Sequence, residues 1–306
     1  MINDIKNRID VLFPSINNRV EEITDSNTLE SNTLWAKMSE KFGDKCRKIL
    51  APLGGVVMDV QTDLQVVNAD ALPVVGVEVI NSMGNALVDT ASWDGTNVNS
   101  SVVNVQLHRI SCPFTLTAYD LQHGERVESK ITAAAETVAK GVVAQFAAAI
   151  EDVDAETISE FSPAAAADMS GVFDVETNAL LLSPAQYSKI VPTSTLALNP
   201  DADGAYGINH IYKSTGTGDI VALTSDAVAG AICTPQVLLN HAGSGVEVRQ
   251  LGTIAGFPML LKAQYDWNEK LKCSVEVMAG FTVANSDGIK VYSVGDTEEE
   301  EAPGSN

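Results

Sequence analysis

The chain has 306 residues, of which 45% are hydrophobic and 19% charged, and its formal net charge is −21. This composition is enough for a sizeable buried core and excludes a disordered chain. The acidic balance argues against a surface devoted to nucleic acid, which needs clustered Lys and Arg, and no apolar run is long enough for a membrane span.

The first part of the chain is expected to form an arm that packs on other elements. Two helical stretches, at 2–13 and 34–50, flank a polar run, and there is little to build an independent core. Residues 1–48 hold eight of the nineteen basic residues, whereas residues 49–108 hold none and carry six acidic ones. Such segments could be complementary between subunits, or they could be ordinary solvated surfaces.

Residues 72–112 are typical of a β excursion. Val75, Val77 and Val79 alternate with other residues, as on a strand, whereas residues 81–100 lose all periodicity and contain turn residues. The alternation resumes at residue 103, and its phase slips by one residue at His108-Arg109. A slip moves the apolar set to the opposite face, so the sequence predicts a bulge or bend there.

A long helix is predicted from Thr117 to about Glu151. Thr117 and Asp120 have the spacing of a capping box, and Gly124 is expected to break the first turn. The apolar stripe is spaced mostly in steps of three or four. Its members are Leu121, Val127, Ile131, Ala134, Ala135, Val138, Val142, Phe146 and Ile150.

The remainder of the chain is a mixture of predicted strands and helices. Residues 178–190 are interpreted as a buried strand followed by a short helix that starts at Ser183-Pro184. Further strands are expected at 220–223, 246–251, 254–261, 273–277 and 289–294, with a helix start at Thr234-Pro235. The acidic tail 296–306 is expected to be disordered.

We find no constellation of residues that predicts catalysis, a cofactor or a metal site. The four histidines are scattered, and the Gly-rich segment 214–219 lacks the Lys of a phosphate-binding loop. Asp201 and Asp203 have the spacing that opens a calcium loop, but the later ligands are missing. The four cysteines form no CxxC motif and are interpreted as reduced, buried thiols in a cytosolic environment. A signal sequence is not apparent.

Three segments, in this order, resemble the major capsid proteins of tailed bacteriophages, whose Hong Kong 97-type fold is shared with encapsulins. Residues 114–125 resemble the entry from a strand into the spine helix. Residues 180–187 resemble the first strand and helix of the axial domain, and residues 251–259 the strand that leaves it. The likeness covers about residues 55–295 and lies in segment order and short motifs.

The resemblance implies an α+β fold with a named set of parts. They are an N-terminal arm (1–68), an extended β-hairpin loop (69–113), a peripheral domain with the spine helix (114–177), an axial domain (178–262), a return to the peripheral domain (263–295) and the tail (296–306). The family usually has a clear second helix between residues 152 and 178, where this sequence is short and Ala-rich.

The implied function is a structural one, with no enzymatic activity and no cofactor. Copies of the chain would form pentamers and hexamers of an icosahedral shell that encloses double-stranded DNA without sequence-specific binding. The shell would assemble in the bacterial cytoplasm and become the virion capsid, away from membranes. No long coiled coil precedes residue 50, so a separate scaffolding protein is implied, together with a portal. The alternatives are an encapsulin nanocompartment and a cytosolic α+β enzyme.

The subunit interface is predicted to use both the arm and the loop. The candidate residues are Lys41, Lys45, Arg47 and Lys48 from the arm, Asp89, Trp93 and Asp94 from the loop, and Arg109. Some family members cross-link their subunits through a Lys on the extended loop. Residues 69–108 contain no Lys, so that chemistry is not expected here.

Overall fold

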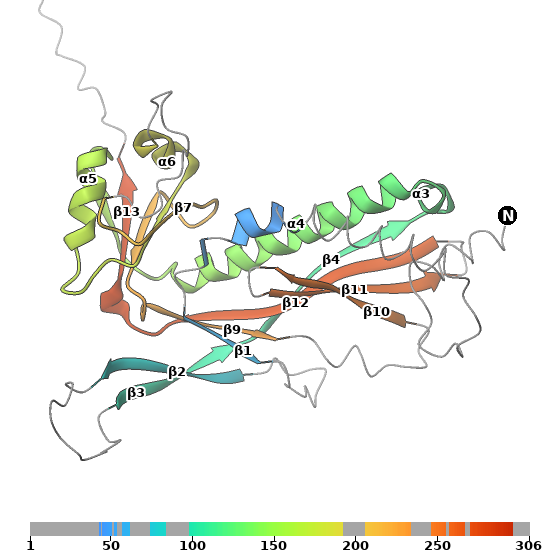
Figure 1. Cartoon of the computed structure of the whole chain (residues 1–306), viewed down its shortest axis with the longest axis horizontal. Coiled ribbons are helices and arrows are strands. Elements are labelled where there is room, and N and C mark those ends of the chain that lie inside the picture. The colour runs from blue at the N-terminus through green and yellow to red at the C-terminus, as the bar shows by residue number, and fades with distance from the viewer. Residues whose placement is uncertain are drawn as a thin grey trace, which may run out of the picture. The chain divides into compact units, whose positions relative to one another are not determined.

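The structure is a computed structural model that describes residues 43, 45–50, 52–53, 57–61, 74–83, 98–191, 206–233, 246–254, 257–266 and 270–295 (Figure 1). The chain divides into two compact units. The first contains residues 1–54, 58–145 and 229–282, and the second contains residues 55–57, 146–228 and 283–306. Each unit is described separately.

The first unit is built on the predicted helix, which the structure divides in two. A short helix, α3 (Ala118–Gln122), precedes the 26-residue helix α4 (Gly124–Ala149), and His123 interrupts them. Thr117 and Asp120 form the predicted capping box through reciprocal side-chain to backbone hydrogen bonds. Every member of the predicted apolar stripe is buried, so this stripe is the core face of the helix.

A six-stranded sheet supports the helix. Its order is β1 (Val57–Gln61), β9 (Val228–Cys233), β12 (Lys270–Val283), β11 (Phe257–Asp266) and β10 (Val246–Ile254), and β4 (His108–Leu116) also pairs with β12. The pairs β10–β11, β11–β12 and β12–β4 are antiparallel. A Cβ on Gly141 would lie 2.7 Å from Cγ2 of Ile110, so α4 packs tightly against β4.

A two-stranded antiparallel ribbon precedes β4. It consists of β2 (Val74–Met83) and β3 (Val98–Gln106), with Val75 opposite Val105 and Val77 opposite Val103. Val75, Val77 and Val79 are buried, as their alternation predicts. In β3 the inward residues have odd numbers up to Leu107, and in β4 they have even numbers, so the predicted change of phase is confirmed.

Gly280 allows the end of β3 to pass close to the backbone of β12. A Cβ on Gly280 of β12 would lie 2.0 Å from the carbonyl oxygen of Gln106 and 3.1 Å from Cγ1 of Val105. The inner face of the ribbon therefore packs directly on the backbone of β12. No larger residue fits at Gly280 without displacing the end of β3.

The second unit contains a five-stranded sheet. Its order is β5 (Ala155–Ile158), β13 (Ile289–Val294), β8 (Ile220–Leu223), β6 (Ala179–Leu182) and β7 (His210–Lys213). The pairs β5–β13 and β6–β7 are parallel, and the other two are antiparallel. The strands predicted at 220–223 and 289–294 have these bounds in the structure.

Two short helices complete the second unit. α5 (Pro163–Asp168) leads into a 3₁₀ turn (Met169–Gly171), and α6 (Pro184–Ile190) starts at the predicted Ser-Pro pair. Phe161, Leu180 and Ile220 are fully buried in the core of this unit. A second 3₁₀ turn (Ser286–Gly288) precedes β13, where the Asn285 amide donates to Asp226 at 2.9 Å. The region 152–178 thus contains one strand and one short helix.

The compact units and the predicted domains group the chain differently. β9 and β11 pair with β12 and β10 pairs with β11 in the first unit, whereas β13 belongs to the second. The predicted boundaries at residues 178, 262 and 295 refer to roles in an assembly and stay predictions. The predictions for residues 1–42, for 84–97, for Thr234-Pro235 and for the tail 296–306 concern segments outside the described residues.

Candidate assembly surfaces

A buried carboxylate organises the corner between α3 and α4. Asp120 is 2% exposed, and it accepts hydrogen bonds from the backbone N–H of Thr117 at 2.9 Å, from Arg126 Nε at 3.0 Å and from Lys130 Nζ at 2.7 Å. Burial by itself would raise the pKa of Asp120, but the hydrogen bonds from Lys130, Thr117 and Arg126 hold this pKa well below its usual range. Asp120 is therefore a fixed negative charge beneath two cations.

One side of this corner presents an aromatic and cationic surface. Tyr119, His123, Arg126 and Lys130 lie together at this corner, because His123 Nδ1 is 2.8 Å from the Tyr119 carbonyl oxygen and both Arg126 and Lys130 donate to Asp120. We call these four residues the corner face. Tyr119 is 56% exposed, its ring centroid is 4.3 Å from that of His123, and the Arg126 guanidinium lies 5.0 Å from the Tyr119 centroid. The rings and the guanidinium thus hold one another in place before any partner binds.

The ribbon has an outer face that is partly apolar and partly acidic. Val74 is 59% exposed and Val102 is 68% exposed, and Glu78 lies directly opposite Val102. Glu78 accepts a 2.5 Å hydrogen bond from the Ser100 hydroxyl. We call Val74, Glu78, Ser100 and Val102 the ribbon face. Gly76 leaves room for Val102, because a Cβ at Gly76 would lie 2.9 Å from Cγ1 of Val102.

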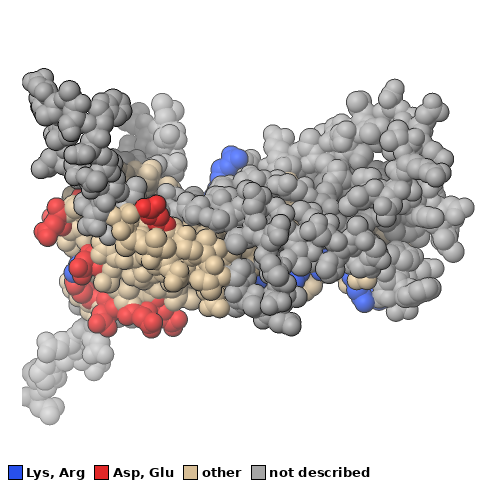
Figure 2. Space-filling model, turned by 90° about the horizontal axis from the view of Figure 1, so that it is seen from below, with Lys and Arg blue, Asp and Glu red and all other residues tan. Residues whose placement is uncertain are grey.

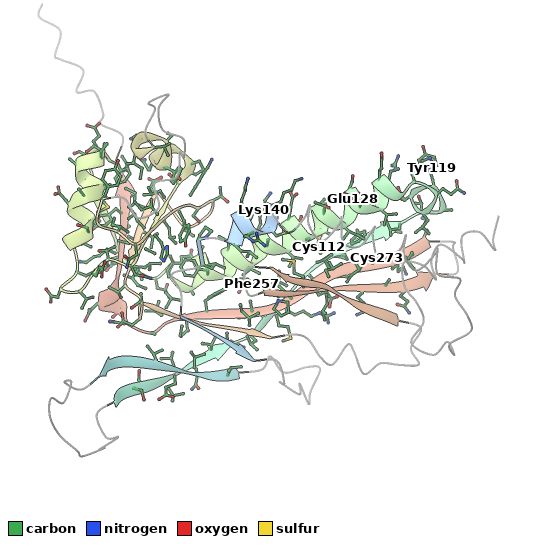
Figure 3. The ribbon with its side chains drawn as sticks, viewed as in Figure 1. Cys112, Tyr119, Glu128, Lys140, Phe257 and Cys273 are labelled. Carbon is green, nitrogen blue, oxygen red and sulfur yellow. The ribbon has the colours of Figure 1, made fainter. Side chains whose placement is uncertain are left out.

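The outer side of α4 carries a polar depression of about 420 Å³. It is lined by Lys45, Glu128, Ser129, Thr132, Ala133 and Glu136. Lys45 forms an ion pair with Glu136 at 3.0 Å, which ties the helical residues 45–50 to α4. In Figure 3, Glu128 and Lys140 point away from the sheet, while Cys112 and Cys273 lie on the sheet side of the helix.

The structure places three of the predicted arm residues and Arg109. Lys45 pairs with Glu136 as above, Arg47 and Lys48 are exposed, and Arg109 donates to Glu276 with Nε at 3.0 Å. Glu276 is 2% exposed, so this pair fastens β4 to β12 within one chain. Lys41, Asp89, Trp93 and Asp94 lie outside the described residues. The contact of these residues with another subunit stays a prediction.

The corner face and the ribbon face were not predicted from the sequence. The only signal for the corner face in the sequence was the spacing of Tyr119, His123, Arg126 and Lys130, which would align them on an unbroken helix, whereas His123 interrupts the helix in the structure. For the ribbon face, the alternation of the valines indicated which residues turn inward. It gave no sign that Val74 and Val102 remain exposed on the other side.

Acidic side chains dominate the described part of the second unit. Residues 146–191, 206–228 and 283–295 contain eleven Asp and Glu residues and three Lys residues. Five of the acidic residues fall within 151–160, where all five are exposed. Figure 2 shows Asp and Glu side chains gathered on one part of the visible surface and a few Lys and Arg elsewhere. Such a surface repels nucleic-acid phosphates.

The buried thiols of Cys46 and Cys273 are unreactive near neutral pH. Burial, with a smaller contribution from Glu136, raises the pKa of Cys46 to about 11, and burial raises that of Cys273 to about 12. Since the thiolate is the reactive form, neither residue is a nucleophile near neutral pH. Cys46, Cys112 and Cys273 are free, and within the described ranges no three His, Cys, Asp or Glu residues are grouped as metal ligands. None of the helices that the structure describes could span a membrane.

Several solved structures are similar to this chain at low sequence identity. No protein-family model and no curated protein matches it. A virus-like particle protein from Pyrococcus furiosus is 12% identical over 83% of this chain and 97% of its own, with a TM-score of 0.46. A structure described as Mycobacterium phage Adephagia is 11% identical over 81% and 91%, with a TM-score of 0.47. The capsid of an empty GTA particle is 10% identical over 80% and 90%, with a TM-score of 0.46.

Proposed function

We propose that this chain is a structural subunit that self-assembles into the icosahedral capsid of a tailed bacteriophage around double-stranded DNA. The observation that carries the proposal is the ribbon β2–β3. The inner face of this ribbon packs on β12, yet its outer face presents Val74 and Val102 to solvent at 59% and 68% exposure. A surface of this kind is expected where another copy of the chain covers it.

The parts of the fold suit a shell subunit. In this proposal α3 and α4 are the spine of the peripheral domain, the ribbon is the base of the extended loop, and residues 178–262 supply the axial domain that meets its copies in pentamers and hexamers. The capping box and the buried stripe make the spine rigid, so contacts at one end can orient the rest of the subunit. Symmetric repetition then adds many weak contacts into a closed shell.

The acidic charge suits a shell interior that encloses DNA without binding it tightly. An acidic surface makes few phosphate contacts, so packaged DNA could slide past it. A separate scaffolding protein and a portal are the further partners of the proposal, and the virion capsid is the location. The buried thiols and the ion pairs described above have structural roles, which agrees with a protein whose work is assembly.

Analytical ultracentrifugation of the purified recombinant chain tests this proposal. A shell subunit is expected to populate discrete pentamers or hexamers, and closed particles when a scaffolding protein is supplied. A chain that stays monomeric under both conditions would contradict the proposal. Particles that assemble around a protein cargo and exclude DNA would instead indicate a nanocompartment shell.

A further inference from the structure

We propose that the second compact unit binds a buried structural water molecule where the loop 214–219 meets the start of α6. The water would be held by three oxygen atoms, namely Gln186 Oε1, Ser214 Oγ and Thr217 Oγ1. The proposal concerns the fold of the single subunit, so it goes beyond the shell function and does not depend on it.

These three oxygens are buried and make no hydrogen bond within the part of the chain that the structure describes. Ser214 is 1% exposed, and Gln186 and Thr217 are each 6% exposed. Burying a hydroxyl or an amide oxygen without a hydrogen bond costs free energy, and native proteins pair nearly all such groups with protein atoms or ordered water. Three such groups in neighbouring segments therefore indicate a bound ligand.

The backbone brings together the two segments that carry these oxygens. β6 and β7 are parallel, so they end at the same edge of the sheet. At that edge the Ser214 N–H donates to the Leu182 carbonyl oxygen at 2.8 Å, and the Ser183 N–H donates to the Asp219 carbonyl oxygen at 2.8 Å. Both ends of the loop 214–219 are thus fastened to the two residues that lead into α6.

The polar side chains of both segments turn away from solvent. Gln186 and Ile190 are the buried residues of α6, and Ile190 packs in the core of this unit. In the loop, Thr217 is buried between Gly216 and Gly218, which are exposed and have φ values of 99° and 92°. Glycine adopts this backbone readily, so the loop can turn the Thr217 side chain inward.

The count of donors and acceptors selects the ligand. A water molecule accepts two hydrogen bonds, which the hydroxyls of Ser214 and Thr217 can donate, and it donates one to the Gln186 carbonyl oxygen. A metal cation would attract all three oxygens but leave both hydroxyl hydrogens unpaired. An anion would accept from the hydroxyls but would be repelled by the Gln186 oxygen. Among these ligands, water alone satisfies all three groups.

The sign of one substitution tests for the water. Thr217→Val keeps the shape of the side chain and removes its hydroxyl. With a water bound, the variant breaks one of its hydrogen bonds, so the folding equilibrium constant of the unassembled full-length subunit, from urea unfolding, should fall about tenfold. In a dry site the variant would remove an unpaired hydroxyl instead. A constant that is unchanged or higher would therefore overturn the proposal. Thr215→Val, at an exposed position of the same loop, is the matched control and should change the constant less than about twofold.

A double-mutant cycle tests whether Thr217 and Gln186 share the water. Gln186→Met removes the acceptor and keeps the length of the side chain, so it should also lower the folding equilibrium constant. Loss of either partner weakens the same water, so the double variant should be less destabilised than the product of the two single effects. Effects that multiply would mean that the two residues hold no common ligand, which would overturn the proposal.

A crystal structure of the unaltered chain, at a resolution that shows ordered water, tests the proposal without any variant. We expect one density peak within hydrogen-bond distance, about 2.7–3.2 Å, of all three oxygens. A peak at about 2.3–2.6 Å would indicate a metal ion. That result, a side chain of another segment in this place, or no peak at all would overturn the proposal.

Discussion

Replacing Asp120 with alanine is expected to lower the free energy of unfolding of the first unit by about 2–3 kcal/mol. Loss of an N-terminal capping interaction costs about 1 kcal/mol. Loss of hydrogen bonds to a charged group costs about 1.5–3 kcal/mol, but the Arg126 and Lys130 side chains are partly exposed, and water replaces part of what they lose. The expected loss of about 2–3 kcal/mol is therefore smaller than the full sum of the capping and hydrogen-bond contributions.

The assay is urea unfolding of the unassembled subunit, followed by circular dichroism of the helices. Glu125→Ala is the matched control, because Glu125 is an exposed carboxylate in the first turn of α4. The control should shift the unfolding free energy by less than about 0.5 kcal/mol. Equal shifts for the two variants would refute the assigned role of the buried carboxylate.

The effect of Asp120→Ala depends on pH in a definite direction. The folded-state pKa of Asp120 lies below the unfolded value of about 3.9, so folding favours the ionised form. Its stabilisation is complete above about pH 5 and is lost as the pH falls through the folded-state pKa. The stability gap between the original chain and the variant should therefore be full at pH 7 and smaller at pH 3. A gap that widens in acid would contradict the ionised assignment.

Three other predictions follow from the fold and the sequence. Gly280→Ala should destabilise the subunit by at least about 2 kcal/mol in urea unfolding, because the new Cβ would lie 2.0 Å from the Gln106 carbonyl oxygen. Gly124→Ala is the control and should be neutral or stabilising, because no atom lies within 4 Å of its new Cβ. Boiled and reduced particles should run on a denaturing gel as single chains of 32.4 kDa, since residues 69–108 contain no Lys for a cross-link, and a ladder of linked subunits would refute this. Assembly followed by light scattering should improve from very low to moderate salt, as repulsion between acidic subunits is screened, and should weaken towards about 1 M as the arm's pairing is screened. Replacing Lys41, Arg47 and Lys48 with Gln should abolish only the weakening at high salt, and a variant that keeps it would show that these charges are merely solvated.

Local features of the fold could be predicted from the sequence because their causes are local. The capping box at Thr117 and Asp120, the stripe of α4 and the phase change after Leu107 each depend on residues within one or two turns or strands. The strand Ala155–Ile158 was missed, since it is short and largely exposed and is held by parallel backbone pairing with β13. The sequence around it contains no alternation that could have indicated it.

Long-range contacts could not be predicted in the same way. Arg109 pairs with Glu276 across 167 positions, and β9, β10 and β11 join the sheet of α4 through pairings that no periodicity encodes. The candidate site has the same limitation. The sequence indicated that an acidic loop and a basic arm could meet between subunits, but the exposed valines and the Tyr119 corner emerge only once the strands and helices are placed.

The central claim is that this chain builds a closed shell, and electron cryomicroscopy of particles assembled from the purified chain tests it most directly. We expect icosahedral particles in which α4 forms a spine within each subunit and the ribbon β2–β3 lies against a neighbouring copy. Particles in which every ribbon contacts only its own chain, or preparations that contain only monomers, would contradict it.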